Sequence, residues 1–272
     1  MERRPSVLTV DDDASMGKVL GALLTQAGFE PLVSGFVRVP YGDIEAIKAV
    51  AEHNKNIVAV MLEIIQGEGG IHLADPAYYR GIRELCDAHD WLMICDEVQC
   101  GMGRTGKWFG YQQAGIQPDI ATLAKGLGSG VPIGACMAGG KAAGLFGPGN
   151  HGSTFGGNPL AAKAALTTID VMEQDGLLAN AAQMGALIRQ LFGEALAGVK
   201  GVVDIRGHGL MIGLELDRPC GALVGKALEA GLLINVTAEC VIRFLPPLIF
   251  SERDARELVE RCAPLIKEFL AA

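Results

Sequence analysis

The chain has 272 residues, of which half are hydrophobic and a fifth are charged. This is enough apolar material for a large buried core and two packed units. Its 23 basic and 31 acidic residues give a formal net charge of -8. No run of lysine or arginine occurs, so the sequence lacks the basic patch expected of a nucleic-acid-binding protein. This class of protein is therefore excluded.

The cysteines, histidines and first residues bear on location and metal binding. Seven cysteines lie in apolar contexts without Cys-x-x-Cys spacing, which favours reduced, buried thiols in the cytoplasm over disulfides or a zinc site. The five histidines share no metal-ligand spacing, so no metal is expected. Near the start, two arginines precede three aspartates without a signal peptide's apolar core. No apolar run approaches the roughly twenty residues of a membrane-spanning helix, so we expect a soluble cytoplasmic protein.

The first part of the chain alternates between two kinds of hydrophobic pattern. Strands are expected at residues 7–10, 57–64, 91–95, 120–123 and 133–138, and helices at residues 15–27, 45–53 and 76–89. The strand at 57–64 is rich in valine and isoleucine, as in parallel strands buried on both faces. This alternation predicts an α/β fold with a mostly parallel sheet.

A second unit is expected after the Asn158-Pro159 pair. Helices are predicted at residues 160–174, 177–197, 221–230 and 252–270, and strands at residues 202–206, 211–216, 232–235 and 241–244. These elements predict a smaller α+β domain.

Carboxylates follow the strand expected at residues 91–95. Asp96 and Glu97 end this apolar segment, and Gln99 follows shortly after. Open α/β sheets bind ligands at the carboxyl ends of their strands. The alternative is that the two carboxylates only cap the strand and solvate a loop. The pattern by itself leaves both interpretations open.

A lysine follows the strand expected at residues 120–123. Lys125 precedes glycines that let the backbone approach a ligand closely. The free amine of a desolvated lysine can form an imine with an aldehyde cofactor, and a carboxylate such as Asp96 can keep the cofactor's pyridinium ring protonated. The alternative is a surface lysine whose stem lies along apolar side chains.

Six short motifs follow one another along the chain: Glu63-Ile-Ile-Gln-Gly-Glu-Gly-Gly, Asp96-Glu-Val-Gln, Gly101-Met-Gly-Arg-Thr-Gly, Thr122-Leu-Ala-Lys-Gly, Pro132-Ile-Gly and Ser153-Thr-Phe-Gly-Gly-Asn-Pro. Their order resembles that of the class III pyridoxal-phosphate aminotransferases, from about Gly28 to the C-terminus. The segment Val241-Ile-Arg-Phe-Leu-Pro-Pro resembles the acetylornithine aminotransferase branch. The resemblance implies a fold-type I large domain followed by a smaller α+β domain.

The resemblance also implies a cofactor site for pyridoxal 5'-phosphate. Lys125 matches the residue that forms the imine and moves the proton, and Asp96 matches the partner of the ring nitrogen. Val98 matches the residue packed on one ring face, and Gln99 the one near the ring hydroxyl. Thr154 matches a residue that reaches the phosphate held by the neighbouring subunit, because the family works as a homodimer.

The implied substrates are an N-acetylornithine-like ω-amino donor and 2-oxoglutarate, as in arginine biosynthesis. Arg243 matches the arginine that grips a substrate carboxylate in a bidentate fork, which a lysine cannot reproduce. Glu68 matches the glutamate gate that pairs with this arginine when no substrate is held. Without the resemblance, Arg243 would be interpreted as an ordinary strand-edge arginine.

A rival motif overlaps this set. Residues Gly101, Gly103 and Gly106 satisfy Gly-x-Gly-x-x-Gly, and Asp119 follows at a plausible distance for a dinucleotide site. That fingerprint should join a strand directly to a helix, whereas Gly106-Lys-Trp-Phe-Gly-Tyr is a poor helix start. We therefore disfavour nicotinamide or flavin binding.

The chain also departs from the family. Residues 1–28 resemble the first strand and helix of a response-regulator receiver domain, where the family has over a hundred residues, on the order of half a domain. We expect residues 29–160 to form the cofactor-binding portion and residues 161–272 the small domain. The glycine turn for the phosphate and the aromatic residue that stacks on the ring are missing from the sequence. Ile64 stands where the family usually has proline. A catalytically weak or inactive remnant, acting at most as a binding or structural protein, is therefore the alternative.

Overall fold

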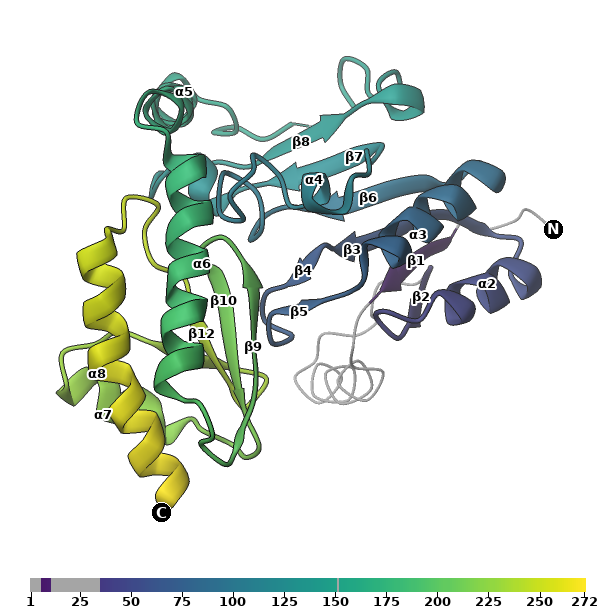
Figure 1. The fold of residues 1–272 in the computed structure, drawn as a ribbon. Coiled ribbons are helices and arrows are strands. Elements are labelled where there is room, and N and C mark those ends of the chain that lie inside the picture. Colours follow the sequence, from purple (N-terminus) through teal and green to yellow (C-terminus); the bar gives the residue numbers. More distant parts are fainter. Residues whose placement is uncertain (1–5, 11–34, 151) are drawn as a thin grey trace, which may run out of the picture.

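Two sheets form the framework of the protein. The computed structural model describes residues 6–10, 35–150 and 152–272 (Figure 1). A six-stranded sheet has the order β2-β1-β3-β6-β7-β8, and a four-stranded sheet has the order β11-β12-β10-β9. A small ribbon of β4 (Ile65–Gln66) and β5 (His72–Leu73) lies between them (Figure 1). This mostly parallel α/β sheet with a second α+β unit confirms the predicted fold class.

The larger sheet is parallel except at one edge. Its strands are β1 (Ser6–Val10), β2 (Phe36–Val39), β3 (Ile57–Glu63), β6 (Leu92–Asp96), β7 (Ile120–Leu123) and β8 (Ala135–Ala138). Only β8 pairs antiparallel with its neighbour. In the register of β3, β6 and β7, Glu63 lies opposite Asp96 and Asp96 opposite Thr122. The carboxyl ends of these three strands therefore meet at one edge.

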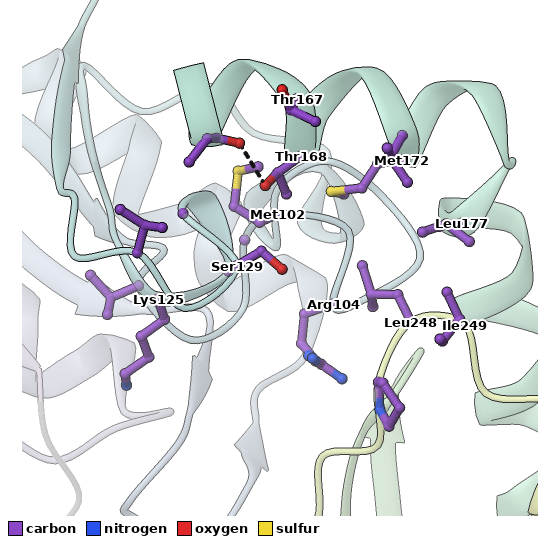
Figure 2. Close-up of a pocket in the computed structure, with 18 of the residues that line it drawn as sticks. Met102, Arg104, Lys125, Ser129, Thr167, Thr168, Met172, Leu177, Leu248 and Ile249 are labelled. Atoms are coloured by element: carbon purple, nitrogen blue, oxygen red, sulfur yellow. Dashed lines mark hydrogen bonds between the residues drawn. The ribbon is translucent and has the colours of Figure 1, made fainter. Parts of the chain in front are cut away.

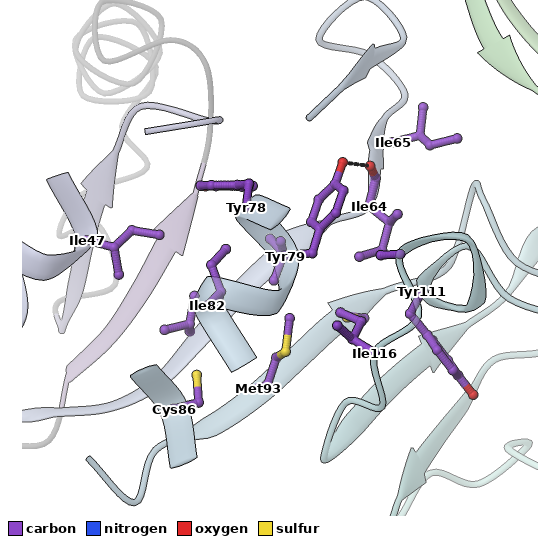
Figure 3. Close-up of a cluster of buried hydrophobic side chains, with 14 of the residues drawn as sticks. Ile47, Ile64, Ile65, Tyr78, Tyr79, Ile82, Cys86, Met93, Tyr111 and Ile116 are labelled. Atoms are coloured by element: carbon purple, nitrogen blue, oxygen red, sulfur yellow. Dashed lines mark hydrogen bonds between the residues drawn. The ribbon is translucent and has the colours of Figure 1, made fainter. Parts of the chain in front are cut away.

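Helices begin where the sequence supplies caps. The carboxylate of Asp43 accepts a backbone hydrogen bond at the start of α2 (Ile44–His53), and that of Asp75 does so at α3 (Pro76–Ala88). Proline at the first turn of α3 costs no hydrogen bond. Both helices bury apolar side chains, such as Ile47 and Ile82, in the core of the large sheet (Figure 3). The caps and the apolar faces together place these helices against the sheet.

The C-terminal unit packs helices on the smaller sheet. Its helices are α5 (Pro159–Gln174), α6 (Leu177–Ala195), α7 (Ala222–Glu229) and α8 (Glu252–Ala271), and its strands are β9 (Val202–His208), β10 (Met211–Leu216), β11 (Asn235–Thr237) and β12 (Val241–Phe244). Figure 1 shows α6 and α8 side by side next to the four-stranded sheet. The Phe192 ring of α6 stacks on Phe244 of β12 with centroids 5.0 Å apart. This core fixes β12, which bears Arg243.

Several local predictions need correction. The strand expected at 133–138 begins only at Ala135, because the preceding residues follow the turn from Gly128 to Val131. The strand expected at 232–235 is wrong: Leu233 is 91 % exposed, and the strand is Asn235–Thr237, which pairs with β12. Cys136 is exposed, against the expectation of buried thiols. The helix predicted at residues 15–27 lies outside the described residues.

Candidate active site

Asp96 is held by neighbours at the end of β6. Its Oδ1 accepts hydrogen bonds from the backbone nitrogen of Val98 and from the hydroxyl of Thr122, both at 3.0 Å. Among the hydrogen bonds described for residues 35–150 and 152–272, none reaches its Oδ2. The carboxylate is thus oriented through one oxygen, while the other remains available to a ligand.

Lys125 follows β7 and opens a short 3-10 turn, Lys125–Leu127. Its φ is +42°, in the left-handed region that non-glycine residues rarely adopt. The side chain is exposed, and within the described part of the chain its Nζ has no hydrogen-bond partner. Strained backbone of this kind persists only where surrounding structure enforces it, as at functional sites. The turn directs an unpaired amine away from the strand.

A cavity of about 860 Å³ adjoins this lysine. Val98, Gln99 and Lys125 line it together with residues of α5 and of the segment that follows β12. Figure 2 shows Lys125 and Arg104 on one side of the cavity, with Thr168 and Met172 of α5 on the other. Its volume lies within the range of small-molecule and cofactor sites. Asp96 does not line it, but its hydrogen bond to Val98 positions the backbone beside it.

Glu68, Gln99 and Arg243 form a hydrogen-bonded cluster near Lys125. Arg243 Nη1 donates to Glu68 Oε1 at 2.7 Å and to Gln99 Oε1 at 3.3 Å, and Gln99 Nε2 donates to Glu68 Oε1 at 3.4 Å. The hydrogen bond from Arg243 lowers the pKa of Glu68, and its charge and that of Lys125 add to the effect. The structure thus brings together a carboxylate, an amide and a guanidinium that lie far apart in the sequence.

The loop between β3 and β4 is fixed by hydrogen bonds despite the isoleucine at position 64. The hydroxyls of Tyr41 and Tyr79 lie 2.8 and 2.7 Å from the carbonyl oxygen of Ile64 (Figure 3). Glu63 Oε2 accepts from the backbone of Gly67 at 2.9 Å. These contacts order the loop in place of a proline.

Gly67 has a packing role. A Cβ atom there would lie 2.3 Å from Cδ of Gln99. Only glycine leaves Gln99 free to reach Glu68 and Arg243.

Glu97 is a buried carboxylate with a structural role. Its side chain accepts the backbone hydrogens of Gly110 at 2.7 Å and Tyr111 at 2.8 Å, at the start of α4 (Tyr111–Ala114). Burial raises its pKa, although these two hydrogen bonds oppose the shift. The two adjacent carboxylates thus have different surroundings, and Asp96 is the one whose side chain accepts a hydrogen bond from the cavity-lining residue Val98.

The Gly101–Gly106 segment lies against the C-terminal helices. A Cβ on Gly103 would lie 2.6 Å from Met172 of α5, and one on Gly106 would lie 2.8 Å from Ala182 of α6. The segment continues through turns, and no helix starts before Tyr111. These glycines allow close packing, and the strand–turn–helix geometry of a dinucleotide site is absent from this segment.

Thr154 is separated from the other expected site residues. It lies in the exposed segment before α5 and does not line the cavity. Phe155 beside it is 82 % exposed. Within this single chain the structure therefore brings together Glu68, Val98, Gln99, Lys125 and Arg243, with Asp96 behind them, and leaves Thr154 at the surface.

Three neighbours of the site were missed from the sequence. Asn235 Oδ1 accepts from Arg243 Nε at 3.0 Å, and the hydroxyl of Thr237 donates to the carbonyl of Glu68. Arg104 donates to the carbonyls of Leu210 and Pro246, and burial lowers its pKa. The alternating polar residues Asn235 and Thr237 were the only local signal for β11, and the contacts of Thr237 and Arg104 could not be predicted because their partners lie over a hundred residues away.

Comparison with known proteins identifies the family of this chain. The family model "Aminotransferase class-III" matches residues 20–266. The chain therefore belongs to the class III aminotransferases, as the ordered motifs predicted.

Curated relatives and solved structures agree with this assignment. The chain is 57 % identical over 251 residues to acetylornithine aminotransferase 1 of Bordetella parapertussis. The aligned region covers 92 % of this chain and 64 % of the relative. It is 56 % identical over 246 residues to acetylornithine aminotransferase of Nitrosomonas europaea, covering 90 % and 63 %. The structure of acetylornithine aminotransferase from Elizabethkingia anophelis matches with a TM-score of 0.84 and 32 % identity, covering 99 % of this chain and 67 % of that one. This chain thus spans just under two thirds of the length of these curated relatives.

Pyridoxal phosphate is the cofactor that family membership implies. The residues present fit it: among the described residues, the Lys125 amine that borders the cavity has no hydrogen-bond partner, and Asp96 behind it has one unengaged oxygen. No helix among the described residues is long and apolar enough to cross a bilayer. Within the same residues, no cluster of three or more histidine, cysteine or acidic side chains could hold a metal ion.

Proposed function

We propose that this chain catalyses pyridoxal-phosphate-dependent transamination between an N-acetylornithine-like ω-amino donor and 2-oxoglutarate, a step of arginine biosynthesis. The observation that carries this proposal is the cavity bordered by Lys125, next to the Glu68–Gln99–Arg243 cluster. The named relatives are acetylornithine aminotransferases, which supports the choice of donor. Ornithine aminotransferases share the fold, so ornithine is the first competing donor.

Lys125 and Asp96 are the proposed catalytic pair. The cofactor, when bound, accepts the amino group and withdraws electrons from the substrate. Lys125 would hold the cofactor through its Nζ, and the same amine could take a proton from the substrate's amine-bearing carbon. Asp96 would keep the cofactor's ring nitrogen protonated through Oδ2, and Val98 and Gln99 would help to hold the ring and its hydroxyl.

Arg243 is the proposed substrate anchor. Its guanidinium can hold a carboxylate through two parallel hydrogen bonds, and Glu68 occupies it in the absence of substrate. One site can then accept both a donor and a 2-oxo acid, because the carboxylate of Glu68 substitutes for that of the substrate.

The working unit is proposed to be a homodimer in the cytoplasm. Thr154 is exposed beside Phe155 and Leu160, which are 82 % and 75 % exposed. A second copy covering these apolar side chains would allow Thr154 to contact the phosphate in the partner's site. The free cysteines support a reducing compartment. Residues 29–160 are proposed as the cofactor-binding portion and residues 161–272 as the small domain.

Titration with pyridoxal phosphate tests the cofactor site. Wild-type protein is expected to develop a visible absorption band that Lys125→Ala abolishes. N-acetylornithine, ornithine and 4-aminobutyrate are then assayed with 2-oxoglutarate, and N-acetylornithine should give the highest kcat/KM. A chain that develops the band but transfers no amino group from any donor contradicts the proposed activity.

A second candidate is a protein that binds a small molecule or a partner without turnover. The exposed position of Thr154 is consistent with this candidate if no second copy covers the segment before α5. In that case added pyridoxal phosphate gives no band, and Lys125→Ala has the same spectrum as the wild type.

A further inference from the structure

Strand β11 contacts both members of the ion pair at the site. Asn235 lies opposite Arg243 in the antiparallel register with β12, and Asn235 Oδ1 accepts from Arg243 Nε at 3.0 Å. Two residues along the same strand, Thr237 donates its hydroxyl hydrogen to the carbonyl oxygen of Glu68. Alternate residues of a strand share a face, so one short strand reaches the arginine and the glutamate from the same side.

The backbone that bears Glu68 is clamped to the smaller sheet. Arg206 of β9 donates to the carbonyls of Gly70 at 2.7 Å and Ile71 at 2.9 Å. A Cβ on Gly70 would lie 3.2 Å from Ala238, in the turn after β11. Thr237 is 6 % exposed, so its hydroxyl is desolvated and needs this one partner. Glu68 therefore projects from a fixed main chain.

The two charged side chains differ in freedom. The side chain of Arg243 is 9 % exposed, whereas that of Glu68 is 72 % exposed. Asn235 occupies Nε of Arg243, and Glu68 and Gln99 meet Nη1. Within the described part of the chain, no hydrogen bond reaches Nη2. A carboxylate that replaces Glu68 can therefore approach only the edge formed by the two terminal nitrogens, because Asn235 blocks the edge that includes Nε.

We infer that β11 is the positioning element of this site: Asn235 fixes the orientation of the Arg243 guanidinium, and Thr237 fixes the main chain of Glu68. Together they direct the substrate carboxylate to the terminal nitrogens of Arg243. This inference rests on the proposed function for the identity of the ligand, an aliphatic dicarboxylate. The positioning itself is a property of the free chain.

Three variants separate these contributions. Asn235→Ala removes the acceptor of Nε, Thr237→Val replaces the hydroxyl with a methyl group of similar shape, and Thr237→Ser keeps a hydroxyl as the matched control. Side-chain NMR of the full chain, labelled in glutamate and arginine, follows the titration of Glu68 and the Nε resonance of Arg243. Calorimetry follows the binding of glutarate, a five-carbon dicarboxylate without a reactive group.

The expected changes are specific to position. Asn235→Ala shifts the Arg243 Nε resonance. It also weakens glutarate binding about tenfold, because the guanidinium loses the charge-assisted hydrogen bond that orients it. Thr237→Val raises the pKa of Glu68 toward its ordinary value, and Thr237→Ser retains the wild-type titration. The measurements are made at pH values where every variant stays folded. A general loss of stability would therefore not produce these position-specific changes in the Glu68 titration and the Arg243 resonance.

Unchanged Glu68 titration and Arg243 resonance in both Asn235→Ala and Thr237→Val overturn the inference. The proposed function is judged separately. A chain that shows the expected shifts but transfers no amino group keeps the positioning role and loses the proposed activity. A chain that transaminates normally in all three variants, with unchanged glutarate affinity, keeps the activity and loses the positioning role.

Discussion

At the scale of single residues, neighbours in sequence acquire different chemistry from their hydrogen-bond partners. Asp96 and Glu97 follow the same strand, yet Glu97 is 1 % exposed and accepts two backbone hydrogens, whereas Asp96 shares one oxygen between Val98 and Thr122. Strand pairing decides this difference, because it brings Thr122 opposite Asp96. Residue type alone does not separate the two roles.

Glu97→Gln is expected to lower the free energy of unfolding by about 1–3 kcal/mol, because the amide can accept only one of the two backbone hydrogens and leaves the other buried and unpaired. Urea denaturation at pH 7 measures this loss. Glu52→Gln on the exposed face of α2 is the matched control and should change stability by less than about 0.5 kcal/mol. Equal stability of the two variants would contradict the structural role.

The same variant has a predicted pH signature. The folded-state pKa of Glu97 is raised above the ordinary value of 4.5. Protonation of Glu97 therefore adds stability that is fully present below pH 4.5 and is lost as pH rises through the folded pKa, while the two backbone hydrogen bonds act above this window as well. Denaturation across this window should show a decline in wild-type stability that Glu97→Gln lacks.

At the scale of elements, side-chain hydrogen bonds hold the loop after β3, where Ile64 lacks the backbone restriction of a proline. Tyr79 lies in α3 and Tyr41 before α2, and their hydroxyls lie 2.7 Å apart and converge on Ile64. The Tyr79 hydroxyl also accepts from the backbone of Ala74 at 2.8 Å. Helix packing thus fixes the loop that leads to Glu68.

Tyr79→Phe is expected to destabilise the protein by about 1–2 kcal/mol, because the backbone hydrogen of Ala74 loses its acceptor in a half-buried position. Amide hydrogen exchange should show the greatest loss of protection around residues 64–74. Tyr111→Phe is a suitable control, since its residue is buried and its hydroxyl points away from Ile64 in Figure 3. Uniform loss of protection along the chain would contradict a local role.

Elements with strong local patterns could be predicted from sequence, and those defined by pairing could not. Residues 120–123, 211–216 and 241–244 were predicted as strands with the bounds that the structure shows. Phe36–Val39 was missed because its residues are largely exposed, with only Val39 buried and Arg38 interrupting the apolar pattern. The short β11 was displaced in the prediction because the apolar residues 232–234 precede the segment that pairs with β12.

The same limit applies to the site. The family motifs predicted Glu68, Gln99 and Arg243, and the structure joins them by hydrogen bonds. Asn235 and Thr237 belong to no motif and could be found only once β11 was placed. Thr154 remains a prediction, because its proposed contact lies in a second copy.

At the scale of the whole molecule, the N-terminal strand is part of the larger sheet. Residues 6–10 lie between β2 and β3, with parallel pairing on both sides. Residues 6–10 therefore contribute a strand to the same sheet that presents Asp96 and leads to Lys125 (Figure 1). A change in this strand should affect the whole sheet, since parallel strands share their hydrogen bonds with both neighbours.

Leu8→Pro tests this coupling. Leu8 pairs with Val37 and Val60, and proline removes the backbone donor in the interior of a sheet. One lost ladder bond and the resulting misfit should lower the free energy of unfolding by about 1–3 kcal/mol, measured by urea denaturation. Leu8→Ala keeps the donor and separates the side-chain effect from the backbone effect. If Leu8→Pro and Leu8→Ala lower the free energy of unfolding equally, the backbone pairing of β1 contributes little. If only Leu8→Pro also weakens the visible cofactor band, the strand supports the site through the sheet.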